Sequence, residues 1–357
     1  MKLFLLSLIL TIFSGCSLFR PSTFRTEDLT FRNETGLRLT GTLYTPMSAP
    51  PYPLMLIAHG SGDFKRSFGF YSVYGEYFAS RGIATFVYDK RGVGDSEGHF
   101  SSEEVYFDSL ASDLSAAFKF ISANPKIKRS ACGILGISQA AWVIPQALQK
   151  IDSIAFVVAV SAPSVPPYYS DSYELGKRML EKGYSEQDAL DIVEYNRVVS
   201  RYVGTFAGRE LAMELKRRNN TKPWFKELGY SPSLSPEDTL RLPQYDHYRR
   251  AAFDPAPFWT KSAVSTLLVF GDKDSHIPVD TSALRYRDIF QKNNFTDFEI
   301  KRFADAGHLI QQVDGVLEQV EPSLVSMVLK GFPKPKPEYL QFVEAWVKTR
   351  IDRSSHQ

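Results

Sequence analysis

The sequence predicts an α/β fold, in which a mostly parallel β-sheet carries helices on both faces and a helical segment is inserted between two strands. Short apolar runs bounded by glycine, proline or polar residues recur at 54–58, 83–88, 131–137, 154–160 and 266–270. Unbroken runs of this length are typical of strands buried on both faces, and helix-forming segments separate them. The alternation stops near residue 163 and resumes at 266, which indicates the insertion.

Composition allows a sizeable core and excludes some partners. The chain has 357 residues, of which 43% are hydrophobic and 23% charged, as in ordinary globular proteins. A single α/β core with one insertion can have this length. The formal net charge of +2 favours neither nucleic acid nor an acidic polymer as a partner.

The N-terminus predicts export and a lipid anchor. Lys2, an apolar run at 3–13 and Ser14-Gly15-Cys16 together indicate a signal peptide at residues 1–15. Cysteine in this position resembles the bacterial lipobox, which implies acylation of Cys16 and, with Ser17 next, the outer membrane or cell surface. The alternative is a plain signal peptide with an incidental cysteine. Residues 16–28 would then form a tether, and with Cys16 acylated Cys132 would have no disulfide partner within the chain.

The remaining elements follow in order along the chain. A hairpin is predicted from strands 29–32 and 37–44, and a late strand at 295–303. Helices are predicted at 70–81, 103–123, 139–150, 281–293, 315–329 and 337–351, and within the insertion at 173–182, 186–203 and 209–218. The expected domains are a core of 29–162 and 261–357 with a helical cap of 163–260.

The central motif is Gly136-Ile137-Ser138-Gln139-Ala140, between a buried strand and a predicted helix. A serine at such a sharp strand-to-helix turn is held in strained backbone geometry, with its hydroxyl projecting above the sheet. The flanking small residues let the strand and the helix approach each other closely. Ser138 is therefore a candidate nucleophile.

Two later strand ends supply an acid and a base. Asp272 and Asp274 follow the strand at 266–270, and His308 follows the strand at 295–303. Because ligands on parallel sheets bind at the carboxyl ends of strands, these side chains are expected near Ser138. His308 would take the proton of Ser138, and a carboxylate would orient the imidazole. Either aspartate could serve, although Asp272 is better placed to bind amides of its own turn.

A glycine-flanked turn, His59-Gly60-Ser61-Gly62, follows the strand at 54–58. Backbone amides in such a turn can stabilise a developing oxyanion. The expected donors are the amides of Ser61 and Gln139. His59 is interpreted as a structural residue of the turn and not as a base.

These motifs, with Asp89-Lys90-Arg91-Gly92 and Ala306-Gly307-His308, resemble the α/β-hydrolase superfamily. More narrowly they resemble capped bacterial esterases related to serine aminopeptidase-like hydrolases, from residue 29 to the C-terminus. The resemblance implies that Asp274 is the triad acid, that residues 89–92 form a structural turn and that no cofactor is needed. The chain departs from the family pattern by Ile137, Ala140 and Ala141, where a histidine and two glycines are usual.

The sequence thus predicts a serine hydrolase, a carboxylesterase for small to medium acyl esters, with Trp142, Tyr168 and Tyr169 in the pocket. These aromatic residues could instead only pack the cap onto the core. One alternative is a peptidase that holds a substrate ammonium group with acidic cap residues, Glu174, Glu181, Asp188, Asp191 or Glu194, which would equally suit a solvated helix face. A second is a non-catalytic binding lipoprotein. The histidines show no metal-binding spacing, and the oligomeric state is left open.

Overall fold

A computed structural model describes residues 23–100, 107–202, 206–228, 251–315, 318 and 333–353. The predicted signal peptide, Cys16 and most of the predicted helix at 315–329 lie outside these residues. Within them, no helix is both long and apolar enough to cross a membrane.

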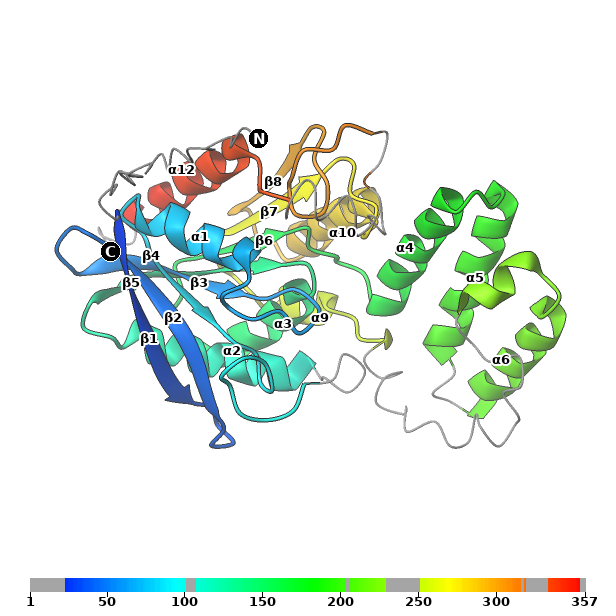
Figure 1. Ribbon diagram of the computed structural model, residues 1–357, viewed down its shortest axis with the longest axis horizontal. Helices are drawn as coiled ribbons and strands as arrows, with labels where there is room; N and C mark the ends of the chain where they lie inside the picture. The colour runs from blue at the N-terminus through cyan, green and yellow to red at the C-terminus, as the bar shows by residue number, and fades with distance from the viewer. Residues whose placement is uncertain are drawn as a thin grey trace, which may run out of the picture.

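The centre of the molecule is an eight-stranded sheet with the order β1-β2-β4-β3-β5-β6-β7-β8 (Figure 1). Strands β3 to β8 run parallel to one another, whereas β2 is antiparallel to both β1 and β4. This confirms the mostly parallel sheet. The strands are β1 (Phe24–Arg32), β2 (Arg38–Pro46), β3 (Tyr52–Ala58), β4 (Ala84–Tyr88), β5 (Ile127–Ile137), β6 (Phe156–Val160), β7 (Thr266–Gly271) and β8 (Phe298–Phe303).

The first strand corrects the predicted tether of residues 16–28. Strand β1 already begins at Phe24, which pairs with Pro46 of β2. The stretch between Arg25 and Asp28 is exposed, because β1 lies at the edge of the sheet and has one strand neighbour. An exposed edge strand lacks the apolar alternation from which strands are predicted, so no pattern in this stretch indicated a strand.

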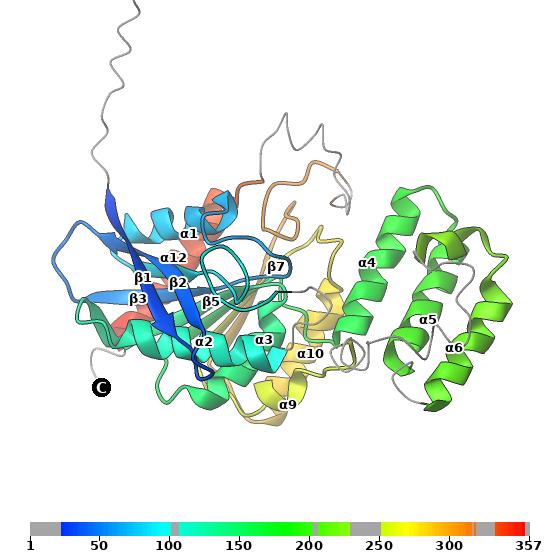
Figure 2. The same cartoon turned by 60° about the horizontal axis from the view of Figure 1, so that its bottom comes forward.

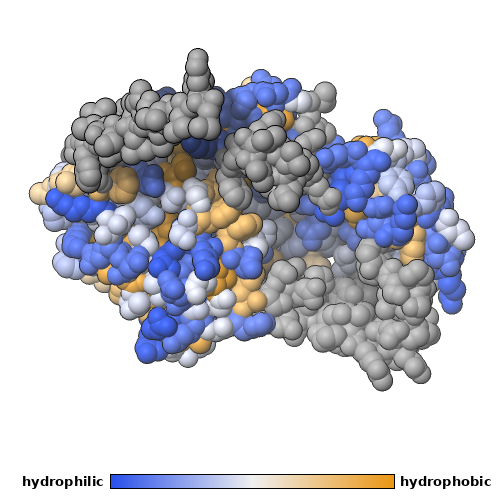
Figure 3. Space-filling view, in the orientation of Figure 1, coloured by the Kyte–Doolittle hydropathy of each residue, from blue (hydrophilic) through white to orange (hydrophobic). Residues whose placement is uncertain are grey.

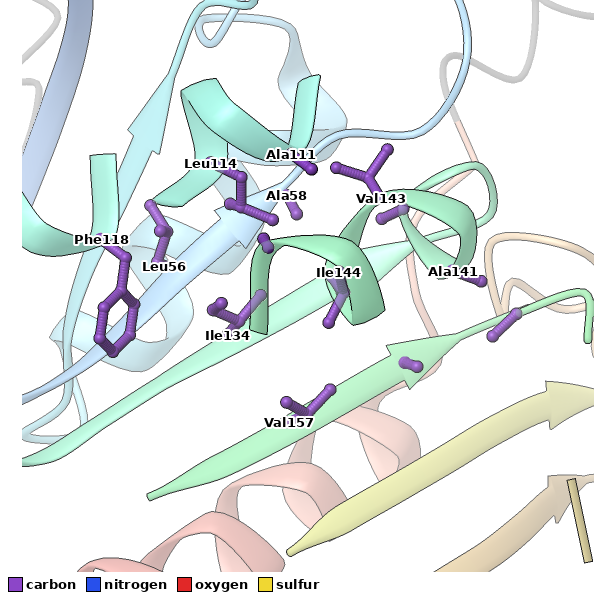
Figure 4. Packing of buried hydrophobic residues seen from close by; sticks show 14 of the residues in the cluster. Leu56, Ala58, Ala111, Leu114, Phe118, Ile134, Ala141, Val143, Ile144 and Val157 are labelled. Carbon is purple, nitrogen blue, oxygen red and sulfur yellow. The ribbon is translucent and has the colours of Figure 1, made fainter. Parts of the chain in front are cut away.

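Helices cover both faces of the sheet, as expected (Figures 1 and 2). Helices α1 (Gly69–Ala79) and α12 (Pro337–Arg353) pack on one face. The opposite face is covered by α2 (Phe107–Ser122), α3 (Ala140–Ala147), α9 (Ala256–Trp259) and α10 (Val279–Lys292). A short 3-10 turn, Leu148–Lys150, extends α3. Figure 4 shows Leu114 and Phe118 of α2 and Ile144 of α3 packed over Leu56 and Ile134 of the sheet.

Four of the helical segments that the structure describes between β6 and β7 form what we call the cap: α4 (Pro167–Glu181), α5 (Glu186–Tyr202), α6 (Phe206–Asn219) and the 3-10 segment Pro223–Leu228. Helix α9, which follows them, packs on the sheet. The cap lies to one side of the sheet domain in both ribbon views (Figures 1 and 2). Helix α4 begins six residues earlier than the predicted 173, because Pro167 has the fixed φ that suits a first helical position.

The end of the predicted cap belongs structurally to the sheet domain. Trp259, expected within the 163–260 insertion, is fully buried. Its indole N–H donates to the carbonyl of Ala141 at 3.2 Å, and its ring packs edge-on against Tyr286 and Phe290 of α10. The chain has therefore rejoined the sheet domain before residue 261.

Candidate active site

Ser138 stands at the turn between β5 and α3, with a φ of 54°. A non-glycine residue in this left-handed region is strained and persists only where its surroundings enforce it. The close packing of β5 against α3 enforces this conformation of Ser138. A Cβ added to Gly136 would lie 2.3 Å from Ile144 Cδ1 and 2.7 Å from Ala140 Cβ. The missing Cβ at Gly136 makes room for the methyl group of Ala140. Alanine in place of the usual glycine is thus compatible with the sharp turn.

His308 and Asp274 are brought together from the loops after β8 and β7. The imidazole Nδ1 lies 2.9 Å from Asp274 Oδ2, and His308 lines the same cavity as Ser138. The other oxygen of Asp274, Oδ1, accepts the backbone N–H groups of His276 at 2.8 Å and Ile277 at 3.2 Å. Asp274 is 2% exposed, and these bonds fix the orientation of its carboxylate toward the imidazole.

Asp272 has a different role in the same loop. Its Oδ1 accepts the backbone N–H of Ala306 at 3.3 Å, and its own N–H donates to the carbonyl of Phe303 at 3.1 Å. It therefore ties the turn after β7 to the turn after β8. The structure brings Asp274, and not Asp272, to His308.

The charges of two further carboxylates act on His308. Glu318 Oε2 accepts the backbone N–H of His308 at 2.6 Å, and Glu174 Oε2 lies 3.4 Å from Nδ1 of His276, whose ring centroid is 4.9 Å from that of His308. Burial alone would lower the pKa of His308. The charge and hydrogen bond of Asp274, followed by the charges of Glu318 and Glu174, outweigh burial and raise this pKa to about 9.

The turn at residues 59–62 runs alongside Ser138. A Cβ on Gly60 would lie 3.6 Å from Ser138 Cβ, and Ser61 lines the same cavity as Ser138 and Gln139. His59 stacks on Tyr71 with centroids 4.0 Å apart. Burial, with a smaller effect of the Lys90 charge, lowers the pKa of His59 to about 3. His59 is thus a neutral packing residue of the turn, as interpreted from the sequence.

A cavity of about 330 Å³ lies above these groups. Trp142 lines it, as predicted, and its indole N–H donates to the carbonyl of Val165 at 2.9 Å. Tyr168 and Tyr169 are not among the described lining residues, which corrects that prediction. The lining residues of the cap are Pro167, Ser170, Asp171 and Glu174 of α4, together with Pro163 before it.

The spacing of a helix explains the correction. The four lining positions on α4 follow the pattern i, i+3, i+4, i+7, which places them on one face. Tyr168 and Tyr169 lie off this face, and the guanidinium of Arg197 from α5 covers the ring of Tyr169 at 3.9 Å. The cap therefore presents carboxylates to the cavity where the sequence had suggested aromatic rings.

The turn after β4 ties three elements together. Asp89 forms an ion pair with Arg66, and its Oδ1 also accepts the backbone N–H of Arg66 at 2.6 Å. Arg91 donates to both oxygens of Asp113 on α2, at 2.7 and 2.8 Å. These contacts agree with the structural turn that the resemblance implied, and Arg91 is not among the described residues that line the cavity.

Several residues around the site had no signal in the sequence. Glu318 and His276 belong to no motif, and each reaches His308 only through the folding of a loop. Cys132 is free and buried in the core of the sheet domain. Among the described residues, no group of three or more histidine, cysteine, aspartate or glutamate side chains could hold a metal ion.

The sheet order, the serine turn after β5 and the histidine and acid loops after β8 and β7 define the α/β-hydrolase fold. The chain has the α/β-hydrolase fold. Residues 49–189 match the family model described as serine aminopeptidase, S33. That stretch includes Ser61, Ser138 and Gln139 and ends before Asp274 and His308.

Known proteins resemble the chain in sequence or in fold. The chain is 27% identical over 168 residues to the uncharacterized protein PA2218 of Pseudomonas aeruginosa, a match that covers 46% of this chain and only 41% of that relative. The structure is similar to the esterase Pf2001 of Pyrococcus furiosus, with 17% identity, a TM-score of 0.51 and coverage of 92% and 93%. It is also similar to Est1E of Butyrivibrio proteoclasticus bound to ferulic acid, with 15% identity, a TM-score of 0.52 and coverage of 92% and 100%.

Proposed function

We propose that the protein is a serine carboxylesterase that cleaves small to medium acyl esters through an acyl-enzyme on Ser138. The observation that carries this proposal is that Ser138 and His308 line the same cavity, while Asp274 lies at Nδ1 of the imidazole. The apolar rings of Phe100, Phe107 and Trp142 line the same cavity and suit an acyl chain. One structure of similar fold, Pf2001, is named an esterase, and another, Est1E, is bound to a carboxylic acid, ferulic acid. Both support an ester as the substrate.

The chemistry follows from these positions. His308 Nε2 takes the proton of Ser138 as its Oγ attacks the acyl carbon, and the amides of Ser61 and Gln139 stabilise the oxyanion. As the C–O bond to the alcohol breaks, His308 returns the proton to the leaving alcohol. Water then attacks the acyl-enzyme with His308 as base, which releases the carboxylic acid and restores Ser138. Apart from the substrate and water, every group that takes part in these steps belongs to a residue of the chain.

A fluorophosphonate probe and a panel of p-nitrophenyl esters of graded chain length test the proposal. We expect the probe to label Ser138, with turnover highest on short or medium chains. Ser138→Ala should lose labelling and at least about 10⁴-fold in kcat while keeping its circular dichroism spectrum. Full esterase activity in the alanine variant would exclude the mechanism, and a wild-type protein that neither labels nor turns over would favour the non-catalytic binding lipoprotein.

A peptidase that removes N-terminal residues is the second candidate, because Asp171 and Glu174 both line the cavity. Two carboxylates at the substrate would favour an ammonium group. Of the acidic residues suggested from the sequence, Glu174 alone belongs to the described lining, whereas Glu181, Asp188, Asp191 and Glu194 do not. Turnover of aminoacyl anilides above that of p-nitrophenyl esters would establish the peptidase.

For the location of the protein, we propose export and anchoring to a bacterial membrane, at the outer membrane or cell surface, through acyl chains on Cys16. The support is the sequence of the signal segment, a basic residue and an apolar run before Ser14-Gly15-Cys16. Membrane fractionation of wild type and Cys16→Ser, with metabolic labelling by a palmitate analogue, tests it. If both proteins fractionate alike as soluble mature chains, the anchor is excluded.

A further inference from the structure

Lys90 is a buried lysine directly behind the turn at residues 59–62. It stands two positions after the end of β4, is 3% exposed, and lies 4.4 Å from the ring centroid of Phe100. Its ammonium donates to the carbonyl of Gly60 at 3.0 Å and also to the carbonyl of Gly62. Both acceptors belong to the turn that carries the amide of Ser61.

Binding the Gly60 carbonyl fixes the direction of the Ser61 amide. The carbonyl of Gly60 and the N–H of Ser61 belong to one planar trans peptide unit and point in opposite directions. A donor that holds this carbonyl on the Lys90 side therefore turns the Ser61 N–H to the other side. The preceding peptide is held as well, because the Gly60 N–H donates to the hydroxyl of Tyr71 at 3.0 Å.

The contact cannot be explained by packing alone. An apolar side chain would fill the same volume without the cost of burying an ammonium group, which is high when no charge compensates it. That cost is visible here, because burial lowers the pKa of Lys90 to about 7, against the opposing charge of Asp63. The neighbours Asp89 and Arg91 are each bonded to a side chain of opposite charge, whereas Lys90 is bonded to two backbone carbonyls of the turn beside Ser138.

We propose that Lys90 is a positioning residue for the oxyanion site, which holds the carbonyls of Gly60 and Gly62 so that the Ser61 amide faces the oxygen that develops charge. This inference rests on the proposed function of Ser138. The lysine acts only through the turn and does not contact the substrate. Its effect should therefore appear in the rate of bond formation at Ser138 and not in the binding of substrate.

The test compares Lys90→Met, Lys90→Gln and Lys90→Arg with the wild-type protein in two assays. The first is the second-order rate of labelling of Ser138 by a fluorophosphonate, and the second is kcat and KM on a p-nitrophenyl ester. The control is Arg91→Met, which removes the neighbouring ion pair with Asp113 on α2. Thermal midpoints are measured for all variants, because both methionine substitutions should lower them.

We expect Lys90→Met to lower kcat and the labelling rate by about 100-fold, the loss found when one oxyanion donor is removed, with KM changed by less than about threefold. Lys90→Arg keeps charge and donors and should recover most of the loss. Lys90→Gln keeps an uncharged NH2 donor group and should give rates between those of the other two variants. If the methionine variant does not fold, the glutamine variant provides the test. Arg91→Met should keep kcat within about threefold despite its lower midpoint.

Three outcomes would overturn the inference, and they can be distinguished. If the wild-type protein labels normally and neither Lys90→Met nor Lys90→Gln slows labelling, Lys90 is only structural and the proposed function stands. Lys90 is likewise only structural if every variant at this position loses rate just in proportion to its loss of folded protein. If the wild-type protein does not label at all, the proposed function fails, and the role of Lys90 fails with it.

Discussion

The sheet domain and the cap of this protein differ in how their parts are held. In the sheet domain, buried side chains form two large clusters, one on each face of a continuous hydrogen-bonded sheet. In the cap, the described buried residues form a separate cluster around Trp224, with Met179, Ile192 and Tyr195. Figure 3 shows the visible surface of the cap as mainly hydrophilic. The cap is thus a small unit with its own core.

The difference separates the proposed chemistry from the proposed selectivity. Ser61, Ser138, Asp274 and His308 all follow strands of the sheet, so the backbone ladder sets their mutual positions. The cap contributes one face of α4, whose position depends on how a helix docks. We infer that substitutions in the sheet domain change the rate of bond formation, whereas substitutions in the cap change which substrate is accepted.

The largest expected effect is in the sheet domain. Asp274→Asn removes the charge beside His308 Nδ1 and should lower kcat by about 10⁴-fold, because the imidazole then adopts the wrong tautomer. Asp272→Asn should act on stability, by about 1–2 kcal/mol, because it weakens the bond to the Ala306 amide. Measurement of kcat and thermal midpoint for both variants checks this. If Asp272→Asn is inactive and Asp274→Asn remains active, Asp272 is the triad acid and Asp274 the structural residue.

The pH profile is the next test of the sheet domain. His308 must be neutral to accept a proton, and its pKa is raised to about 9, so kcat/KM should rise with pH until near that value. Burial raises the pKa of Glu318, against the charge of His308. Glu318→Gln removes a carboxylate from His308 and should move the rise to lower pH.

The rate at pH 7 should then increase by up to about tenfold, because a lower pKa leaves a larger fraction of the imidazole neutral at that pH. The matched control is Glu338→Gln, at an exposed glutamate of α12. An identical profile in the Glu318 variant would show that this carboxylate does not act on the imidazole. The charged form of His308 also stabilises the fold, fully below about pH 6.5, and this contribution should be lost as pH rises to about 9.

A smaller effect is expected from the cap. Glu174→Gln removes a negative charge from the cavity wall and should raise KM for substrates with an ammonium group by about tenfold, with little change for neutral esters. Glu181→Gln, on the same helix but outside the described lining, is the control. If Glu174→Gln loses activity equally on charged and neutral substrates, the cap does not act on substrate selectivity alone.

The smallest effect on activity should come from the core of the cap. Trp224→Ala opens a cavity that costs about 3–5 kcal/mol, which the separate cluster should confine to the cap. Hydrogen exchange should therefore accelerate in α4 and α5 and stay unchanged in β5 and β6, while kcat on a short ester falls less than about threefold. Faster exchange in the central strands would mean that the two regions unfold as one unit.

The sequence predicted the buried strands well because burial on both faces leaves an unbroken apolar run. The predicted strands at 54–58 and 266–270 differ from β3 and β7 by two residues or fewer at each end. The serine turn and the loop positions of Asp274 and His308 were predictable for the same reason, since parallel strands end at a common edge. The family resemblance selected Asp274 over Asp272, and the geometry agrees with it.

What could not be predicted depends on contacts between distant segments. The rotation of α4 about its axis decides which of its side chains line the cavity. Asp171 and Glu174 line it, whereas Tyr168 and Tyr169 are not among the described lining residues. Glu318 lies ten residues from His308 and yet accepts its backbone N–H, a contact that belongs to no local pattern. The bonds of Lys90 to the turn at 59–62 join the ends of two neighbouring strands, β4 and β3, which no local pattern indicates.

The turn after β4 also limits how this part of the chain can change. Asp89, Lys90 and Arg91 are consecutive, yet they reach three different places: Arg66, the carbonyls of Gly60 and Gly62, and Asp113. Insertion of a single residue after Tyr88 would move every one of them to its neighbour's place and put a negative charge where the Gly60 carbonyl now meets a donor. A substitution in this turn alters one of these contacts, whereas an insertion or deletion alters all three together. We therefore expect this part of the chain to tolerate substitutions better than changes in loop length.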